Sequence, residues 1–530
     1  MSDSVGGLRL ARPIDRLIDR LSSPGGVAVF WVLYGCLFSA IYFAFTRTLA
    51  LDDAVSAELM QRHLAPAYQI RNPPAFEWML WFVQQVFGSG LLSFVVLRYS
   101  LVAAFGVLTF AAVRQATGDR RLAAALSVSL PLFFWLGWDF HYRVTHSLGL
   151  LVFGLGAWIA LIRYRERPDA KTAVLAGLLI GAAFVSKWNI CIFFSALLVV
   201  FVADPKGRAA LANWRTSFIA LGALLPVLPP LLWLLARRST VTDEVAGRII
   251  VDRPAYLDFI GTGILDLVVA VVLFLLPWLA FVAGAAALSR APREALPSAA
   301  GRPADAGRLA LRATGVALLI ALGLIPFIGA AHTDFRYMYP LFLVFPVGVA
   351  SLIAGRVDSA RFARAILVAS LCMIAIASVI RVGALNQPDA DRARGQEALR
   401  PYEGLAEDLA RRAFAAADIV TLDPRDAGNL GSLLPEARVR ALASNREDTP
   451  PSDTGRACVV LWHGQTVQLP ASSAVPDVPE DIRRLGGELS PSAVVALPVE
   501  WPKPLWGPVR RTTWFAISGE SAAPVCARAR

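Results

Sequence analysis

Long apolar segments, separated by short polar ones, run through the first 385 residues of this 530-residue chain. A helix needs about 20 apolar residues to cross the hydrocarbon layer of a bilayer, and the recurrence of this length predicts about 11 transmembrane helices. The pattern is therefore that of an all-α polytopic membrane protein. The expected spans are 27–46, 90–112, 122–136, 146–162, 172–186, 189–203, 215–235, 263–288, 309–329, 336–354 and 362–382.

Basic residues predict the orientation of these spans. With residues 1–26 in the cytoplasm, the inner segments contain about 20 Lys and Arg residues, whereas the outer loops up to residue 336 contain about 10. Cytoplasmic loops are enriched in Lys and Arg, so we expect the N-terminus inside and the C-terminus outside; the inverted topology is the alternative. The run 27–46 is too long for a signal peptide and has no small-x-small cleavage site, which predicts a retained span.

After residue 385 the chain becomes more polar and contains no further span. Short β-rich segments and a helix over 425–434 predict a small α/β domain outside the membrane over residues 386–530. Cys458 and Cys526 lie in this domain and are able to pair in an oxidising compartment, whereas the other cysteines are expected in the cores of spans. The expected strands are 417–422, 438–442, 457–462 and 512–517, and the other cysteines are Cys36, Cys191 and Cys372.

Composition agrees with a membrane protein. Charged residues make up 17% of the chain, against about 25% in soluble domains. The net charge of +11 is attributed to loop arginines that face an anionic leaflet, because no basic stripe with interleaved aromatics suggests nucleic acid. The chain has no phosphate-binding Gly-rich loop and no recognisable Ser-His-Asp order. A soluble nucleotide is therefore not the expected donor.

Two adjacent carboxylates, Asp52 and Asp53, directly follow the first span and open a long outer loop over residues 47–89. Ionisable groups at a membrane face are costly and usually functional, although a solvated helix end is the simpler alternative. Arg71 precedes a Pro-Pro turn that ends any helix in this loop. Residues 76–87 then have an aromatic-rich face, which predicts a helix in the headgroup plane.

Basic residues interrupt two later apolar regions. Lys187 breaks a run of about 30 apolar residues, and Arg336 and Tyr337 open the tenth span. Such side chains suit the phosphate of a lipid headgroup. A snorkelling Lys and an ordinary aromatic belt are the simpler alternatives.

The segment 138–146, between the third and fourth spans, contains an Asp, an Arg and two His residues. Asp139, His141 and His146 are metal-ligand types, but their spacing matches no standard zinc pattern, so no metal site is predicted. Arg143 and His146 are candidates for substrate binding. The simpler alternative is an interfacial aromatic loop in which Arg143 snorkels to water.

In this order, these features resemble the bacterial polyprenyl-phosphate-dependent glycosyltransferases of the GT-C fold, the family 39-like enzymes related to protein O-mannosyltransferases and to the lipid A aminoarabinose transferase. The resemblance covers residues 25–385. The matching motifs are Asp52-Asp53, Asn72–Trp78, the Gly-rich segment Gly177–Lys187, and Arg336-Tyr337 with Pro340. Two positions depart from the pattern: Asn72 stands where the aminoarabinose enzyme has Lys, and His146 stands where many relatives have Asp.

The resemblance implies a GT-C membrane domain over residues 27–385 that transfers a sugar from a polyprenyl phosphate to a hydroxyl of an envelope acceptor. Asp52, with Asp53 beside it, would accept the proton of the attacking hydroxyl. Lys187 or Arg336 would stabilise the leaving phosphate. The further binding candidates are Arg71, Arg143, His146 and Tyr337. This chemistry requires no cofactor, and a divalent metal is compatible with it.

The expected location is the bacterial inner membrane, with the C-terminal domain in the periplasm. The expected partners are the lipid-linked sugar donor, an envelope acceptor (lipopolysaccharide, glycan, lipid or protein) and the bilayer, with no nucleic acid. Three other functions remain open: a flippase of lipid-linked sugars, a ligase or polymerase of lipid-linked oligosaccharides, and a non-catalytic scaffold. A flippase would have polar clusters on both sides of the bilayer, whereas the sequence concentrates them on one side.

Overall fold

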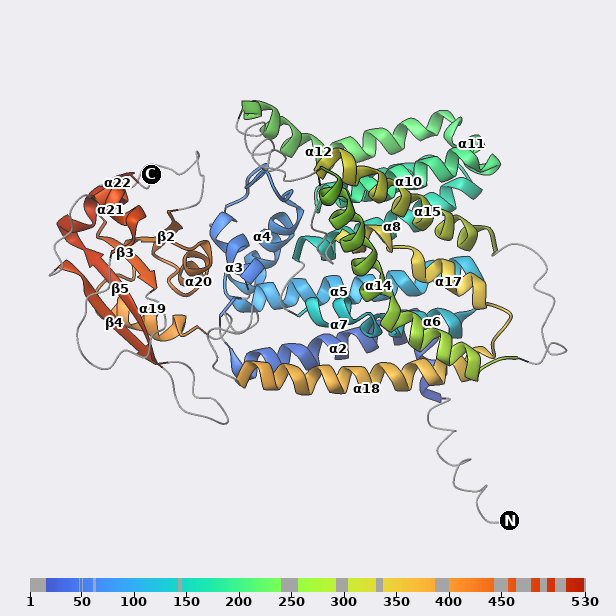
Figure 1. Ribbon diagram of the computed structural model, residues 1–530, viewed down its shortest axis with the longest axis horizontal. Helices are drawn as coiled ribbons and strands as arrows, with labels where there is room; N and C mark the ends of the chain where they lie inside the picture. The colour runs from blue at the N-terminus through green and yellow to red at the C-terminus, as the bar shows by residue number, and fades with distance from the viewer. Residues whose placement is uncertain are drawn as a thin grey trace, which may run out of the picture. The chain divides into compact units, whose positions relative to one another are not determined.

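The computed structural model describes most of the chain (Figure 1). The described residues are 16–46, 48–49, 51–60, 63–141, 145–239, 256–291, 304–329, 337–386, 400–442, 456–463, 478–486, 493–500 and 511–528. They form two compact units. The first contains Met1–Leu37, Pro66–Phe76 and Arg98–Ala377, and the second contains Phe38–Ala65, Glu77–Leu97 and Ser378–Arg530.

The chain is a multi-pass membrane protein. Within the described ranges, 7 helices are long and apolar enough to cross a bilayer, or 8 when a bent pair is counted as one span. Each lies at a position where the apolar pattern predicts a span. The long helices are α2 (Pro24–Phe45), α5 (Leu91–Thr117), α8 (Thr145–Glu166), α12 (Ser217–Ala236), α14 (Tyr256–Leu288), α15 (Ala304–Leu324) and α18 (Ser359–Asn386).

The remaining expected spans are short or interrupted. The bent pair is α10 (Ile190–Ala203) with α11 (Pro205–Leu211), which turn by 107°, and α9 (Ala170–Phe184) is a short apolar helix. Proline limits helix propagation, and Pro131 lies in the 3₁₀ turn that divides the expected span 122–136. The count of 11 crossings remains a prediction. Two expected spans, 122–136 and 336–354, are divided. The pieces of the first are α6 (Arg120–Val128), η1 (Leu130–Leu132) and α7 (Phe134–Asp139). The pieces of the second are α16 (Met338–Leu341) and α17 (Phe345–Ile353).

Small residues bring α9 close to α12 in the first unit. A side chain at Gly177 or Gly181 would overlap the carbonyl oxygens of Ile219 and Ala223 on α12. Glycines four residues apart let membrane helices approach to backbone contact. This packing fixes α9, whose C-terminal end leads directly to Lys187.

In the second unit, the first outer loop forms the helix α3 (Leu51–Met60) and most of α4 (Ala75–Phe87). The helix predicted over 76–87 is therefore confirmed. Leu80 is fully buried, whereas Phe82 and Val86 are 63% and 75% exposed. This amphipathic character is typical of a helix at an interface.

The C-terminal part of the second unit is an α/β domain built on a five-stranded sheet with the order β2-β1-β3-β5-β4. β1 pairs in parallel with β2 and β3, and β5 pairs antiparallel with β3 and β4. Four strands match the predicted ones; β4 was missed, because Pro498 is unusual within a strand and is tolerated at a sheet edge. The strands are β1 (Asp418–Thr421), β2 (Arg438–Ala441), β3 (Cys458–His463), β4 (Val495–Glu500) and β5 (Arg511–Ser518).

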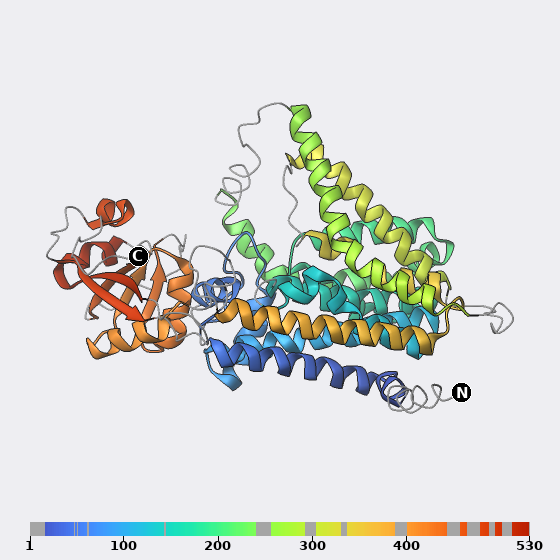
Figure 2. The same cartoon turned by 60° about the horizontal axis from the view of Figure 1, so that its bottom comes forward.

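Helices cover both faces of this sheet (Figures 1 and 2). The helices α19 (Tyr402–Arg411) and α20 (Pro424–Leu433) enclose one core, and α21 (Glu480–Gly486) and α22 (Ala523–Arg528) enclose the other. A disulfide joins Cys458 on β3 to Cys526 on α22, with the Cα atoms 6.3 Å apart. The sequence left this pairing open, and the structure contains it.

The expectation for the other cysteines was wrong. Cys36, Cys191 and Cys372 are free and exposed on their helices rather than buried in the core. A thiol behaves as a small apolar group, so the surface of an apolar membrane helix accommodates it as readily as the interior.

Candidate functional site

Lys187 lies in the break between α9 and α10, within the first unit. Its Nζ atom donates a hydrogen bond to Ser147 Oγ on α8 at 2.8 Å and lies 5.9 Å from the centroid of the Tyr337 ring. Ser147 is buried, whereas Tyr337 is 46% exposed. The ammonium group is thus held between a hydroxyl on one helix and an accessible aromatic ring on another.

The loop that contains the Pro-Pro turn is attached to the same break. The Ala75 amide donates to the Val185 carbonyl at 2.8 Å, and Trp188 Nε1 donates to the Ile70 carbonyl at 3.3 Å. These bonds join sequence neighbours of Lys187 to both ends of the turn. They place Arg71, which is exposed, in a loop anchored at the Lys187 segment.

His146, at the start of α8, connects this loop to Lys187. Its ring is hydrogen-bonded to the Pro73 carbonyl and interacts electrostatically with Lys187 and Arg71. The Phe76 ring lies 5.6 Å from the imidazole, centroid to centroid. The fold therefore gathers four of the candidate residues from distant parts of the sequence. We call Arg71, His146, Lys187 and Tyr337 the basic cluster.

Two other candidates, Arg143 and Arg336, lie outside the described residues. His141, which belongs to the same polar segment 138–146, is buried. Tyr34 and Tyr99 hydroxyls lie 3.0 and 2.9 Å from its two ring nitrogens, and Arg98 donates to its carbonyl at 2.7 Å. His141 thus links helices through hydrogen bonds. No three His, Cys, Asp or Glu side chains in the described part of the chain form a metal-binding group.

The acidic pair lies in the first turn of α3, in the second unit. Asp53 is 2% exposed, whereas Asp52 is only partly buried, as are Val55 and Leu59 further along the helix. Residues spaced three and seven apart share one face of a helix. Asp52 is therefore on the accessible face of α3, and Asp53 is on a buried one.

The buried face of α3 that contains Asp53 also contains Ser56, which donates a hydrogen bond to Glu77 on α4 at 3.1 Å. Both residues are 1% exposed. Burial raises the pKa of Glu77 to about 8, although the hydrogen bond from Ser56 opposes the shift. The Glu77 carboxyl is therefore largely protonated at neutral pH and adds no full negative charge beside the acidic pair.

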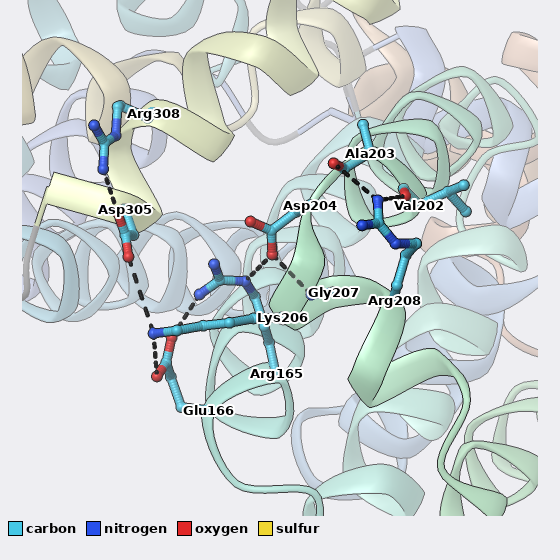
Figure 3. Close-up of polar contacts among 10 residues, drawn as sticks. All are labelled: Arg165, Glu166, Val202, Ala203, Asp204, Lys206, Gly207, Arg208, Asp305 and Arg308. Carbon is cyan, nitrogen blue, oxygen red and sulfur yellow. Dashed lines mark hydrogen bonds and ion pairs between the residues drawn. The ribbon is translucent and has the colours of Figure 1, made fainter.

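Ionic contacts fix the end of α8 that is farthest from His146, roughly 28 Å away at 1.5 Å per residue. Figure 3 shows Arg165 between two carboxylates: its guanidinium bonds Asp204 at 2.7 Å and Glu166 at 2.5 Å. Asp204 also accepts from the Gly207 amide at 2.7 Å and so caps α11. This network holds the bend between α10 and α11, and thereby the helix that begins just after Lys187.

The chain is similar in sequence to known glycosyltransferases. Residues 71–233, which include Arg71, His146 and Lys187, match the family model of dolichyl-phosphate-mannose-protein mannosyltransferase. The chain is 26% identical over 470 residues to the lipopolysaccharide core galacturonosyltransferase RgtB of Rhizobium johnstonii, covering 87% of this chain and 91% of the relative. It is 25% identical to RgtA of the same organism, covering 81% and 85%. The chain is a GT-C glycosyltransferase.

Solved structures agree with the GT-C fold. The glycosyltransferase matches ArnT from Cupriavidus metallidurans in the apo state with a TM-score of 0.55 and 13% identity, covering 92% of this chain and 98% of ArnT. ArnT bound to undecaprenyl phosphate matches with a TM-score of 0.52 and 14% identity, covering 93% and 98%.

Three further residues were not predicted from the sequence: Ser147 beside Lys187 in the first unit, and Ser56 and Glu77 in the second. Glu77 left a signal, because it is the only acidic residue in the aromatic helix α4. Ser147 follows the candidate His146 directly. Ser56 is separated from Asp53 by three positions, which is the spacing of a shared helix face.

Proposed function

We propose that this glycosyltransferase moves a sugar from a polyprenyl phosphate to a hydroxyl of a lipopolysaccharide-type acceptor on the periplasmic face of the bacterial inner membrane. Galacturonic acid is the first sugar to test, because the relatives that match over most of the chain are named as lipopolysaccharide core galacturonosyltransferases. The ArnT structure named as bound to undecaprenyl phosphate supports a polyprenyl-phosphate donor.

The basic cluster is the observation that carries this proposal. A phosphate next to a membrane span needs cations that are held in place, and Lys187 is fixed by Ser147 at 2.8 Å. Arg71 and Lys187 both interact with His146. Fixed positive groups stabilise the charge that develops on a leaving phosphate. Tyr337 would add a contact to the same phosphate, and so would Arg336 in the role that the sequence predicts for it.

Asp52 is the proposed general base. It lies on the accessible face of α3, whereas Asp53 is 2% exposed and is assigned a supporting role. In the proposed step, Asp52 accepts the proton as the acceptor oxygen bonds to the anomeric carbon, and the bond from that carbon to the phosphate oxygen breaks. Polyprenyl phosphate leaves, and attack from the opposite side inverts the anomeric centre. This step requires no cofactor.

The proposed topology places the N-terminus in the cytoplasm and the α/β domain over residues 386–530 in the periplasm. The disulfide between Cys458 and Cys526 supports this placement, because such bonds persist in oxidising compartments. The basic inner loops support it as well. The membrane domain over residues 27–385 would then present its first outer loop, 47–89, to the periplasm.

Mass spectrometry of envelope glycolipids from cells with and without the gene tests the proposal. We expect the deletion strain to lose one sugar from a lipopolysaccharide species, with a mass difference of a hexuronic acid when the sugar is galacturonic acid. If the protein were a flippase, its deletion would instead leave the lipid-linked sugar on the cytoplasmic side, and the purified protein would show no transfer. Unchanged glycolipids, together with no transfer from the polyprenyl-phosphate sugar by purified protein, would contradict the proposal.

A further inference from the structure

The helix α20 of the C-terminal domain packs directly against α3, and both belong to the second unit. A side chain at Gly428 would collide with the carbonyl oxygen of Ala54, and its Cβ would lie 2.6 Å from the Ala54 carbonyl carbon. Ala54 is fully buried and follows Asp53 in the sequence. The two helices are thus in backbone contact next to the acidic pair.

A hydrogen bond secures the chain just before α3. Asn429 Oδ1 accepts from the Leu49 amide at 2.7 Å, and both residues are 2% exposed. Further along α3, Glu58 Oε1 accepts from the Ala441 amide of β2 at 3.5 Å. Ala54 and Glu58 are four residues apart and share one helix face. The C-terminal domain therefore contacts α3 and its approach segment on both sides of Asp52.

The contacting helix is itself firmly held. Asp423 caps its N-terminus by accepting from the Arg425 amide at 2.9 Å. Tyr402 on α19 donates to buried Asp426 at 2.5 Å, and Arg400 lies 3.3 Å from the same carboxylate. An element anchored in this way is able to fix the position of another helix.

Glycine within a helix is less favourable than alanine, so its presence at a packed position has a reason. The helix α20 contains two glycines. At Gly431 an added Cβ would meet only Val439 among the described residues, at 3.8 Å, which is an ordinary contact. Close approach to α3 therefore requires glycine at 428 but not at 431.

We infer that Gly428 and Asn429 are positioning residues of the transferase: the C-terminal domain holds α3 in the register that presents Asp52 to the acceptor. This inference rests on the proposed role of Asp52. It gives the C-terminal domain a part in the chemical step, through the placement of a helix, rather than in binding of the donor phosphate.

The test compares Gly428→Ala with the matched control Gly431→Ala in the full-length protein. A misplacement of about 1 Å at a reacting group costs about 100-fold in rate. We expect kcat to fall by about 10-fold to 100-fold in Gly428→Ala, with the KM for the donor changed by less than about threefold, because the basic cluster is on other elements. Gly431→Ala should keep the kcat of the parent. Equal kcat values in the two variants would overturn the inference.

Hydrogen exchange of the peptide covering 51–60 provides a second readout that does not depend on activity. We expect faster exchange there in Gly428→Ala, with the strands of the sheet unchanged. Faster exchange with a normal kcat would make the contact merely structural and overturn the inference. If the strands of the sheet also exchange faster in Gly428→Ala, the kcat values of Asn429→Ala and Asn429→Asp are compared instead. Asp keeps a side-chain oxygen that accepts from the Leu49 amide, so Asn429→Asp should retain more kcat than Asn429→Ala. A loss of kcat in Asn429→Ala that Asn429→Asp does not restore would overturn the inference.

The outcomes also separate this inference from the proposed function. An active Asp52→Asn variant would remove Asp52 from the base role, while a slow Gly428→Ala variant would still show that the position of α3 matters. An inactive Asp52→Asn variant together with a normal Gly428→Ala variant would keep the base and reject the positioning role.

Discussion

Ser56 on α3 donates a hydrogen bond to Glu77 on α4, with 3.1 Å between Oγ and Oε1. This bond places a third acid, buried like Asp53, about one helical turn beyond the pair Asp52 and Asp53. The two kinds of acid differ in environment, because Asp52 is partly accessible whereas Glu77 is 1% exposed. Asp52 is therefore in a position to accept a proton, whereas the Glu77 carboxyl stays largely neutral because it is buried.

The pH dependence of stability tests the state of Glu77. Its pKa rises from 4.5 to about 8 on folding, so the native state binds more protons and stability falls as the pH rises from about 4.5 to 8. Each unit of difference corresponds to about 1.4 kcal/mol. We expect Glu77→Gln to lose less thermal stability than the parent between pH 5 and pH 8. The control is Glu403→Gln, at an exposed position, whose thermal stability should depend on pH as that of the parent does. A plot of thermal stability against pH for Glu77→Gln that runs parallel to that of the parent would contradict the assignment.

Removal of the Lys187 ammonium should impair use of the donor. Loss of one fixed group that stabilises developing charge costs about 100-fold to 1,000-fold, and we expect Lys187→Ala to lower kcat/KM for the donor by that factor. Ser147→Ala, which removes only the hydroxyl that holds the ammonium, should have a smaller effect in the same direction. Lys171→Ala is the control, since Lys171 is exposed at the opposite end of α9. Donor titrations with purified protein check this, and an unchanged donor dependence in Lys187→Ala would reject its contact with the phosphate.

The ionic network around Arg165 should govern stability rather than chemistry. The Arg165 side chain is 3% exposed, whereas that of Lys206 is 55% exposed. Removing one partner of a buried ion pair costs about 3–5 kcal/mol, against less than about 1 kcal/mol for an exposed pair. We expect a large drop in the thermal unfolding temperature for Arg165→Ala and a small one for Lys206→Ala. Activity per folded molecule should be retained in both, and equal unfolding temperatures would contradict the account.

The sequence predicted most of the secondary structure because its strongest signals are local. Apolar runs marked the long spans to within a few residues in most cases, as for 27–46 and α2 (Pro24–Phe45). The failures have physical causes. Pro131 occurs within an expected span that the structure divides, and Pro498 concealed an edge strand. An apolar run reports the length of a segment but not the breaks within it.

The candidate site was predictable residue by residue but not as a set of contacts. Lys187 and His146 stood out because charged and polar groups are rare at membrane depth. Their hydrogen-bond partners, Ser147 for Lys187 and the Pro73 carbonyl for His146, did not stand out, since neither has a distinctive sequence signal. The packing of Gly428 on Ala54 joins positions 374 residues apart, and nothing local in either segment predicts it.

Substitution of the acidic pair tests the central claim most directly. Purified Asp52→Asn and Asp53→Asn proteins would be assayed for transfer from a polyprenyl-phosphate sugar to lipopolysaccharide, with binding of the donor measured in parallel. A general base contributes about 100-fold to 10,000-fold, so Asp52→Asn should lose that factor in kcat while its affinity for the donor stays within about threefold of the parent. Near-normal transfer by folded Asp52→Asn would contradict the account.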